Sequence, residues 1–76
     1  MKQFVSNALG VIEYLEITDQ PTKSIVMRFS KMYSWDKMTK IVHVVQLFPW
    51  WQKNKKAAFM KAVGLVNKKE KEVRHE

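Results

Sequence analysis

Two adjacent tryptophans followed at once by lysines are the residues of this sequence best suited to binding chemistry. Trp50 and Trp51 precede Lys53, Lys55 and Lys56. Lysine ammonium groups neutralise phosphates, and an exposed aromatic ring stacks on an unpaired base with a gain of about 1–3 kcal/mol. The segment therefore favours contact with single-stranded RNA or DNA over the reading of bases in a duplex, for which Arg and Asn would be expected.

The same segment has two other interpretations. The tryptophans can belong to the core, because large aromatic side chains supply much of the burial in a small domain, and the lysines would then only keep the protein soluble. Aromatic rings beside lysines also suit the surface of an anionic membrane. Seven acidic residues and an alternating segment at 24–30 favour a soluble globule, so membrane binding is not expected.

A last helix is expected to position most of the lysines. Asn54 is a plausible N-cap, and the residues after it divide at helical spacing into two faces. The apolar face holds Ala58, Phe59, Ala62, Val63, Leu65 and Val66, and the opposite half holds Lys53, Lys56, Lys61, Lys68, Lys71 and Arg74. We expect this helix to reach about residue 74, with residues 69–76 as a charged tail that frays.

Two further helices are expected before it. Ser34 is a good N-cap and Asp36 suits the first turn of a helix that Pro49 ends. Its apolar side holds Trp35, Met38, Ile41, Val42, Val45 and Phe48. A first helix over 2–16 has one apolar side, although residues 11–17 could instead form a strand because Ile, Tyr and Val favour one.

The remaining segment, 24–30, predicts a strand. Ile25, Met27 and Phe29 alternate with polar residues, and the preceding segment 18–22 is rich in turn formers. The expected fold is therefore α+β and mainly helical, a single domain over 1–76 in the order helix, strand, helix, helix. Because the strand must pair, its partner is either a short strand at 15–18 or the same strand of a second copy, which would make a homodimer.

From Ser24 to about Lys71, this order of strand, helix, short connection and helix is similar to the ribbon-helix-helix family. That resemblance implies a dimer whose paired strands enter the major groove, with Ser24, Arg28 and Ser30 facing the bases. The chain departs from the family in its additional N-terminal helix and in lacking a glycine-containing turn between the helices. Without the resemblance, Arg28 is equally well explained as a solvated residue.

Charge is concentrated in the second half of the chain. Residues 1–36 have four basic and four acidic side chains, whereas residues 37–76 have ten basic and three acidic ones, so the net charge of +7 belongs to the second half. Such a distribution suits a polyanionic partner. The absence of cysteine and of a leader sequence indicates an intracellular, cytoplasmic protein.

Catalysis is not expected. The sequence has no acid/base or nucleophile motif, no glycine-rich phosphate loop and no metal-ligand spacing, so we expect no enzyme activity, no metal and no cofactor. The function predicted is that of a small regulatory protein that binds RNA or DNA and acts by occupancy. Its site would comprise Lys53, Lys55, Lys56, Lys61, Lys68, Trp50, Trp51 and Arg28. The alternative is a small inhibitor, of the kind that phages and toxin–antitoxin systems carry, that blocks an acidic protein or a ribonucleoprotein.

Overall fold

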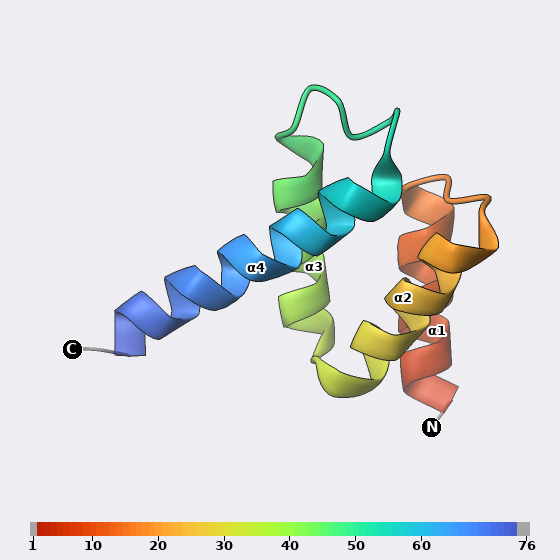
Figure 1. The fold of residues 1–76 in the computed structure, drawn as a ribbon. Helices are drawn as coiled ribbons and strands as arrows, with labels where there is room; N and C mark the ends of the chain where they lie inside the picture. Colours follow the sequence, from red (N-terminus) through yellow and green to blue (C-terminus); the bar gives the residue numbers. More distant parts are fainter. Residues whose placement is uncertain (1, 75–76) are drawn as a thin grey trace.

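The protein folds into four helices (Figure 1). In the computed structural model, which describes the backbone of residues 2–74 and the side chains of residues 7–72, α1 spans Lys2–Tyr14, α2 Gln20–Met32, α3 Trp35–Gln46 and α4 Lys55–Arg74. The main packed pairs are α1 with α2 and α3 with α4. The last turns of α4 extend beyond the other three helices.

One apolar core joins all four helices. Its largest fully buried side chains are Phe59 from α4, Met38 and Ile41 from α3, and Leu15, which follows α1. The other members are Ala8, Val11, Ile17, Val26, Val42, Val45, Ala58, Ala62, Val63 and Val66. The apolar faces predicted for the last two helices supply most of this core, although Trp35 and Leu65 are exposed.

The strand predicted at 24–30 is wrong, because this segment lies inside α2. Asp19 is the N-cap, and its carboxylate accepts hydrogen bonds from the backbone N–H of Thr22 at 2.9 Å and from the Thr22 hydroxyl. Pro21 lies in the first turn of α2, where a backbone N–H has no acceptor within the helix, so the missing N–H of proline costs no hydrogen bond. The residues that suggested a turn therefore start a helix.

The buried side of α2 explains why its helical period was hidden. Thr22, Val26 and Ser30 are buried at intervals of four residues, and two of these three side chains are polar. The apolar side chains at 25, 27 and 29 are only half-buried around that stripe. The apolar residues of this segment therefore repeat every two positions along the sequence, whereas the buried positions repeat about once per helical turn.

The expected α+β fold is corrected with the strand. Across residues 2–74 the structure is all-helical and has no sheet, so neither a strand at 15–18 nor a strand from a second copy is needed as a partner. The argument for a homodimer that rested on strand pairing is removed. The resemblance to the ribbon-helix-helix family fails for the same reason, since Ser24, Arg28 and Ser30 lie on a helix.

The helices predicted at both ends of the chain are present. The first ends at Tyr14, which excludes the alternative strand at 11–17. Ser34 caps α3 by accepting a hydrogen bond from the Lys37 N–H at 3.2 Å, and Asn54 caps α4 by accepting one from the Ala57 N–H at 3.1 Å. These caps fix where α3 and α4 begin, and the Asn54 cap therefore ends the connection that leads from α3 into α4.

Candidate nucleic-acid interface

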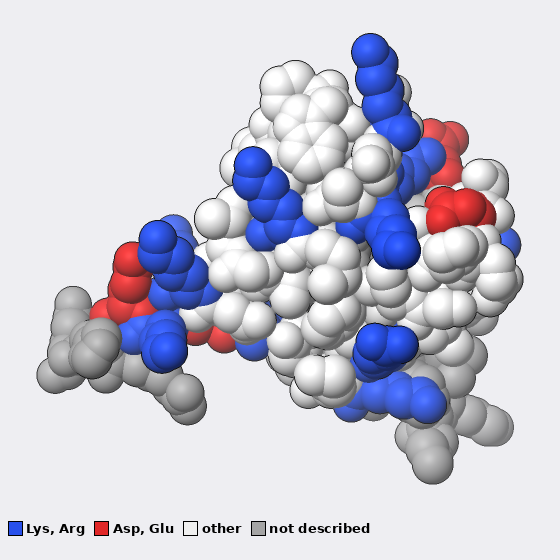
Figure 2. Space-filling view, in the orientation of Figure 1, with Lys and Arg blue, Asp and Glu red and all other residues white. Residues whose placement is uncertain are grey.

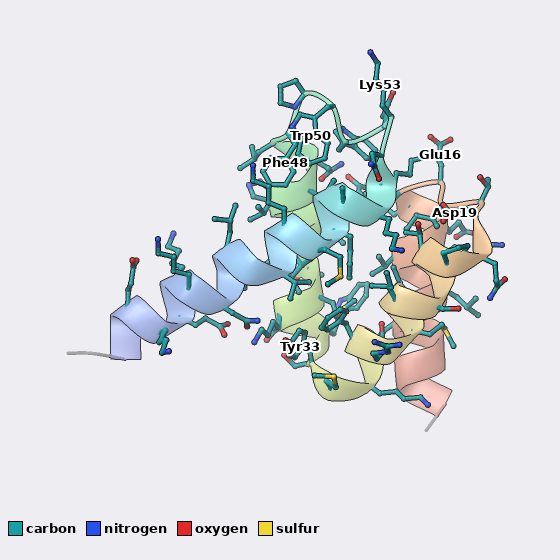
Figure 3. The ribbon with its side chains drawn as sticks, viewed as in Figure 1. Glu16, Asp19, Tyr33, Phe48, Trp50 and Lys53 are labelled. Carbon is teal, nitrogen blue, oxygen red and sulfur yellow. The ribbon has the colours of Figure 1, made fainter. Side chains whose placement is uncertain are left out.

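Phe48, Trp50 and Lys61 form a compact group, here termed the aromatic platform, where α3 connects to α4. The ring centroids of Phe48 and Trp50 lie 5.1 Å apart with planes 1° from parallel. The Lys61 ammonium lies 5.4 Å from the centroid of Phe48 and 5.8 Å from that of Trp50, within range of a cation–π interaction. Figure 3 shows the two rings side by side.

Consecutive turns position these rings. The Phe48 N–H donates to the Val45 carbonyl at 3.1 Å, and the Lys53 N–H donates to the Trp50 carbonyl at 3.0 Å. The sequence placed Phe48 on the buried side of the third helix, but that helix ends at Gln46 and Phe48 turns toward Trp50. The role of Phe48 as the neighbour of Trp50 was therefore missed, and Pro49 between them was the available signal of a turn.

Trp50 and Trp51 are both half-buried and pack against the core. Each of them is therefore partly a core residue and partly available at the surface, as the two interpretations of the sequence separately proposed. The Trp50 ring belongs to the aromatic platform beside Lys61. No ring or cation contact is recorded for Trp51 among the described side chains, so Trp50 is the better placed of the two for contact with a ligand.

Three of the predicted lysines, Lys53, Lys61 and Lys68, are exposed in the connection before α4 or on α4 itself. Lys53 is exposed in the connection and points away from the body of the protein (Figure 3). Lys61 and Lys68 are exposed on α4. Because they are seven residues apart, close to two helical turns, they share one side of the helix about 10 Å apart along its axis. Lys61 and Lys68 therefore form one basic side of α4.

Lys55 and Lys56 face a different neighbour, the loop between α1 and α2. The Lys55 ammonium donates to the backbone carbonyl of Glu16 at 2.8 Å. The pKa of Asp19 is lowered, chiefly by the hydrogen bonds from the side chain and backbone of Thr22 and to a smaller extent by the positive charge of Lys56. The Lys55 contact joins the start of α4 to that loop, apart from the aromatic platform.

Arg28 is exposed on α2, so its predicted position on a strand facing the bases is wrong. Figure 2 shows basic side chains over α4, over α2 and at the connection before α4, with acidic side chains near the edges of this face. The sequence has eight lysines and no aspartate or glutamate between Asp36 and Glu70. No carboxylate therefore lies within one turn of Lys61 along α4, whereas Glu72 lies one turn beyond Lys68.

Other kinds of site find little support in the described side chains. No cluster of three or more His, Cys, Asp or Glu residues that could hold a metal ion occurs there. No helix within residues 2–74 has both the length and the apolar character to cross a membrane. His43 is exposed on the outer side of α3. Comparisons of the chain with protein families, curated proteins and solved structures found no match.

Proposed function

We propose that this protein binds single-stranded RNA or DNA and acts by occupying it. The observation that carries the proposal is the aromatic platform, in which the half-buried Trp50 is flanked by an ammonium group. A base stacks on Trp50, while Lys53, Lys61 and Lys68 neutralise phosphates on either side. The half-buried state of Trp50 supports this role because the ring is held in place before the base arrives.

The charges around α4 favour a single strand of nucleic acid lying along this helix. Along α4 no carboxylate lies within one helical turn of Lys61, so a phosphate approaching Lys61 is not repelled there, and Lys68 has only Glu72 one turn beyond it. The side chains offered are lysines rather than the arginine and asparagine forks that read base edges in a duplex. Binding is therefore expected to tolerate many sequences and to depend strongly on salt.

The first test is the salt dependence of binding to labelled oligouridylate and oligothymidylate, followed by fluorescence anisotropy. If Lys53, Lys61 and Lys68 each neutralise one phosphate, log Kd rises by about 2 for each tenfold rise in salt, because a single strand contributes about 0.7 per phosphate. Lys61→Ala and Lys68→Ala should each reduce that slope by about 0.7. Lys55→Ala is the matched control, since the Lys55 ammonium donates to the Glu16 carbonyl and its removal should change the slope little.

The stacking role is tested with the fluorescence of Trp50. The double variant Trp35→Phe with Trp51→Phe leaves Trp50 as the only tryptophan. A base that stacks on Trp50 quenches this fluorescence in proportion to occupancy. Bound oligonucleotide without quenching would contradict the stacking role, and absence of salt-dependent binding to both oligonucleotides would overturn the proposed function. Melting curves of each variant confirm that it is folded.

A further inference from the structure

A separate groove, here termed the α3–α4 groove, lies between the outer side of α3 and the last turns of α4. It encloses about 1040 Å³. Half-buried Val44 and buried Val66 give it an apolar floor, one from each helix. Its walls are lined by Lys37, Thr39, Lys40, His43, Asn67, Lys69, Glu70 and Lys71.

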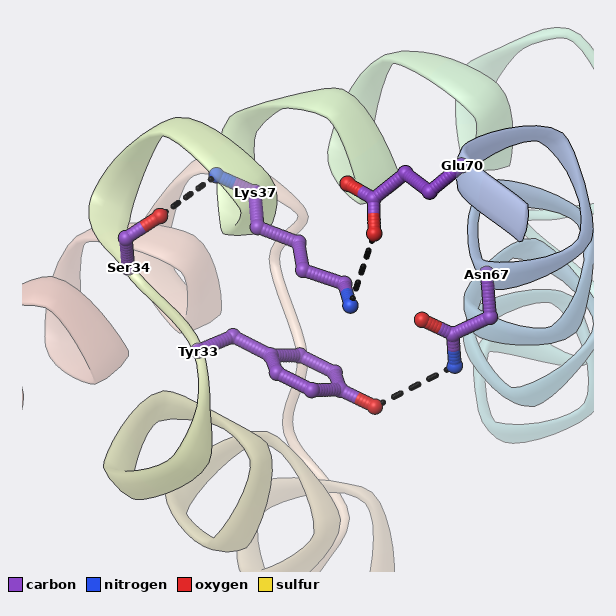
Figure 4. Close-up of polar contacts among 5 residues, drawn as sticks. All are labelled: Tyr33, Ser34, Lys37, Asn67 and Glu70. Atoms are coloured by element: carbon purple, nitrogen blue, oxygen red, sulfur yellow. Dashed lines mark hydrogen bonds and ion pairs between the residues drawn. The ribbon is translucent and has the colours of Figure 1, made fainter. Parts of the chain in front are cut away.

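Polar contacts at the start of α3 fix the width of this groove (Figure 4). The Asn67 amide donates to the Tyr33 hydroxyl at 3.2 Å, and the Lys37 ammonium lies 3.1 Å from the Glu70 carboxylate. The same ammonium lies 3.9 Å from the centroid of the Tyr33 ring. These contacts hold the projecting half of α4 in place against the start of α3.

The charge of the α3–α4 groove is positive once that ion pair is counted. Glu70 is the only carboxylate among its described lining residues, and Lys37 neutralises it. Lys40, Lys69 and Lys71 are exposed around the groove and have no carboxylate among their recorded contacts there. The groove therefore combines an apolar floor with positively charged walls.

We propose that the α3–α4 groove binds an acidic amphipathic helix of a partner protein. A helix that docks in a groove buries apolar residues spaced at i, i+3, i+4 and i+7, and valines from two helices form a suitable floor. Carboxylates flanking that apolar stripe would meet Lys40, Lys69 and Lys71. Apart from the imidazole of His43, the described lining has no aromatic ring on which a base could stack, and its valine floor favours a peptide over a nucleic acid.

This surface is distinct from the aromatic platform, and neighbouring lysines separate the two. Lys68 lies on the basic side of α4 with Lys61, whereas Lys69 lines the α3–α4 groove. Adjacent helical residues point about 100° apart, so the two ammonium groups serve different surfaces. Their substitutions change the net charge equally and can therefore serve as controls for each other.

The probe is a synthetic peptide of about 18 residues, roughly five helical turns, with leucines at i, i+3, i+4 and i+7 and glutamates on both flanks. Binding to the intact protein is followed by NMR through the backbone amides. We expect shifts confined to residues 37–44 and 66–71. Two control peptides replace the glutamates by lysine or the leucines by serine, and both should bind at least tenfold more weakly.

Charge reversal then locates the contact. Lys69→Glu and Lys40→Glu should each weaken binding of the acidic peptide by roughly tenfold, because a like charge replaces an attractive one. Lys68→Glu should change it less than twofold, yet it should weaken oligonucleotide binding if the proposed function is right. All three side chains are exposed, and melting curves check the fold of each variant.

Several outcomes would overturn the proposal. If Lys68→Glu and Lys69→Glu reduce the affinity for the acidic peptide equally, the peptide is attracted by the overall positive charge and does not bind in the α3–α4 groove. Binding of the serine peptide as tightly as the leucine peptide would remove the role of the apolar floor. Groove shifts that depend on protein concentration alone would assign the surface to a second copy of the chain, and groove shifts caused by an oligonucleotide would assign it to nucleic acid.

Discussion

Glu16 ends α1 in a backbone conformation that glycine normally supplies. Its φ is 55°, in the left-handed region. The Ile17 N–H donates to the Ile12 carbonyl at 2.9 Å, and the Glu16 N–H donates to the Glu13 carbonyl at 3.1 Å. This pair of bonds is a Schellman motif, which closes a helix while the residue at C′ adopts positive φ. A side chain at that position costs about 1–2 kcal/mol.

Glu16→Gly is therefore expected to stabilise the protein. The strain at φ 55° disappears, and the greater freedom of glycine in the unfolded chain offsets part of that gain, leaving about 0.5–1 kcal/mol. The hydrogen bond from Lys55 is retained because it uses the backbone carbonyl. Urea denaturation measures the change. Glu16→Ala is the control and should give no such gain, and equal stabilisation by both would show that the side chain, rather than φ, is responsible.

Asp19 should make stability depend on acid pH. Hydrogen bonds from Thr22 lower the pKa of this carboxyl below its ordinary value of 3.8. A lowered pKa in the folded state means that the cap stabilises fully above the unfolded pKa and is lost as the pH falls through the folded pKa. We expect the difference in melting temperature between the wild type and Asp19→Asn to shrink below about pH 4. The amide still accepts hydrogen bonds but does not titrate, so a constant difference would contradict this role.

Two buried hydroxyls on α2 should respond oppositely to removal. Thr22 donates to Asp19, whereas Ser30, 3% exposed, has no hydrogen-bond partner for its hydroxyl in the described structure. Ser30→Ala is expected to stabilise the protein by about 0.5 kcal/mol, because alanine favours a helix and no bond is lost. Thr22→Val should destabilise it by about 1 kcal/mol. Chemical denaturation compares the two, and a loss of stability in Ser30→Ala would reveal an unrecognised partner.

These hydroxyls explain why sequence reasoning failed at α2 and succeeded at α3. At α3, Ser34 precedes an apolar stripe whose buried members are all apolar. At α2, polar residues occupy two of three buried positions, and the cap Asp19 lies among turn formers. An aspartate two residues before a proline, as in Asp19-Gln20-Pro21, is typical of either a turn or the start of a helix. Only the packing of the residues that follow distinguishes these two outcomes.

The candidate site was predictable in composition but not in grouping. The sequence brought Trp50 and the lysines together because they are adjacent along the chain. It could not show that Lys55 turns toward Glu16, 39 residues away, since that contact depends on how α4 meets the loop before α2. Nor could it predict the α3–α4 groove, whose lining residues come from two separate helices. Contacts between distant segments leave no periodic signal.

At the scale of the whole molecule, the fold separates the two proposed binding surfaces. The core uses the inner sides of all four helices, which leaves the basic side of α4 and the α3–α4 groove on the outside. Since the last turns of α4 extend beyond the other helices, more than one side of α4 is left uncovered by them (Figure 1). A chain of 76 residues thereby presents two surfaces around one helix.

The packing of α4 on the core depends on Phe59, the largest fully buried side chain, which is 0% exposed. Its ring lies 5.9 Å from that of Phe29 and links α4 to α2. Phe59→Ala should cost about 3–5 kcal/mol. At roughly 0.05–0.15 kcal/mol per residue, a domain of this size has only about 4–11 kcal/mol in total.

We therefore expect Phe59→Ala to lose a large part of the stability and to melt at a much lower temperature, while Phe59→Leu, which keeps most of the volume, loses about 1–1.5 kcal/mol. Circular dichroism during urea and thermal denaturation measures both. Because α4 contributes to both proposed binding surfaces, Phe59→Leu should bind oligonucleotide and acidic peptide like the wild type at low temperature. A cost below about 1 kcal/mol for Phe59→Ala would mean that α4 is not seated on the core through this ring.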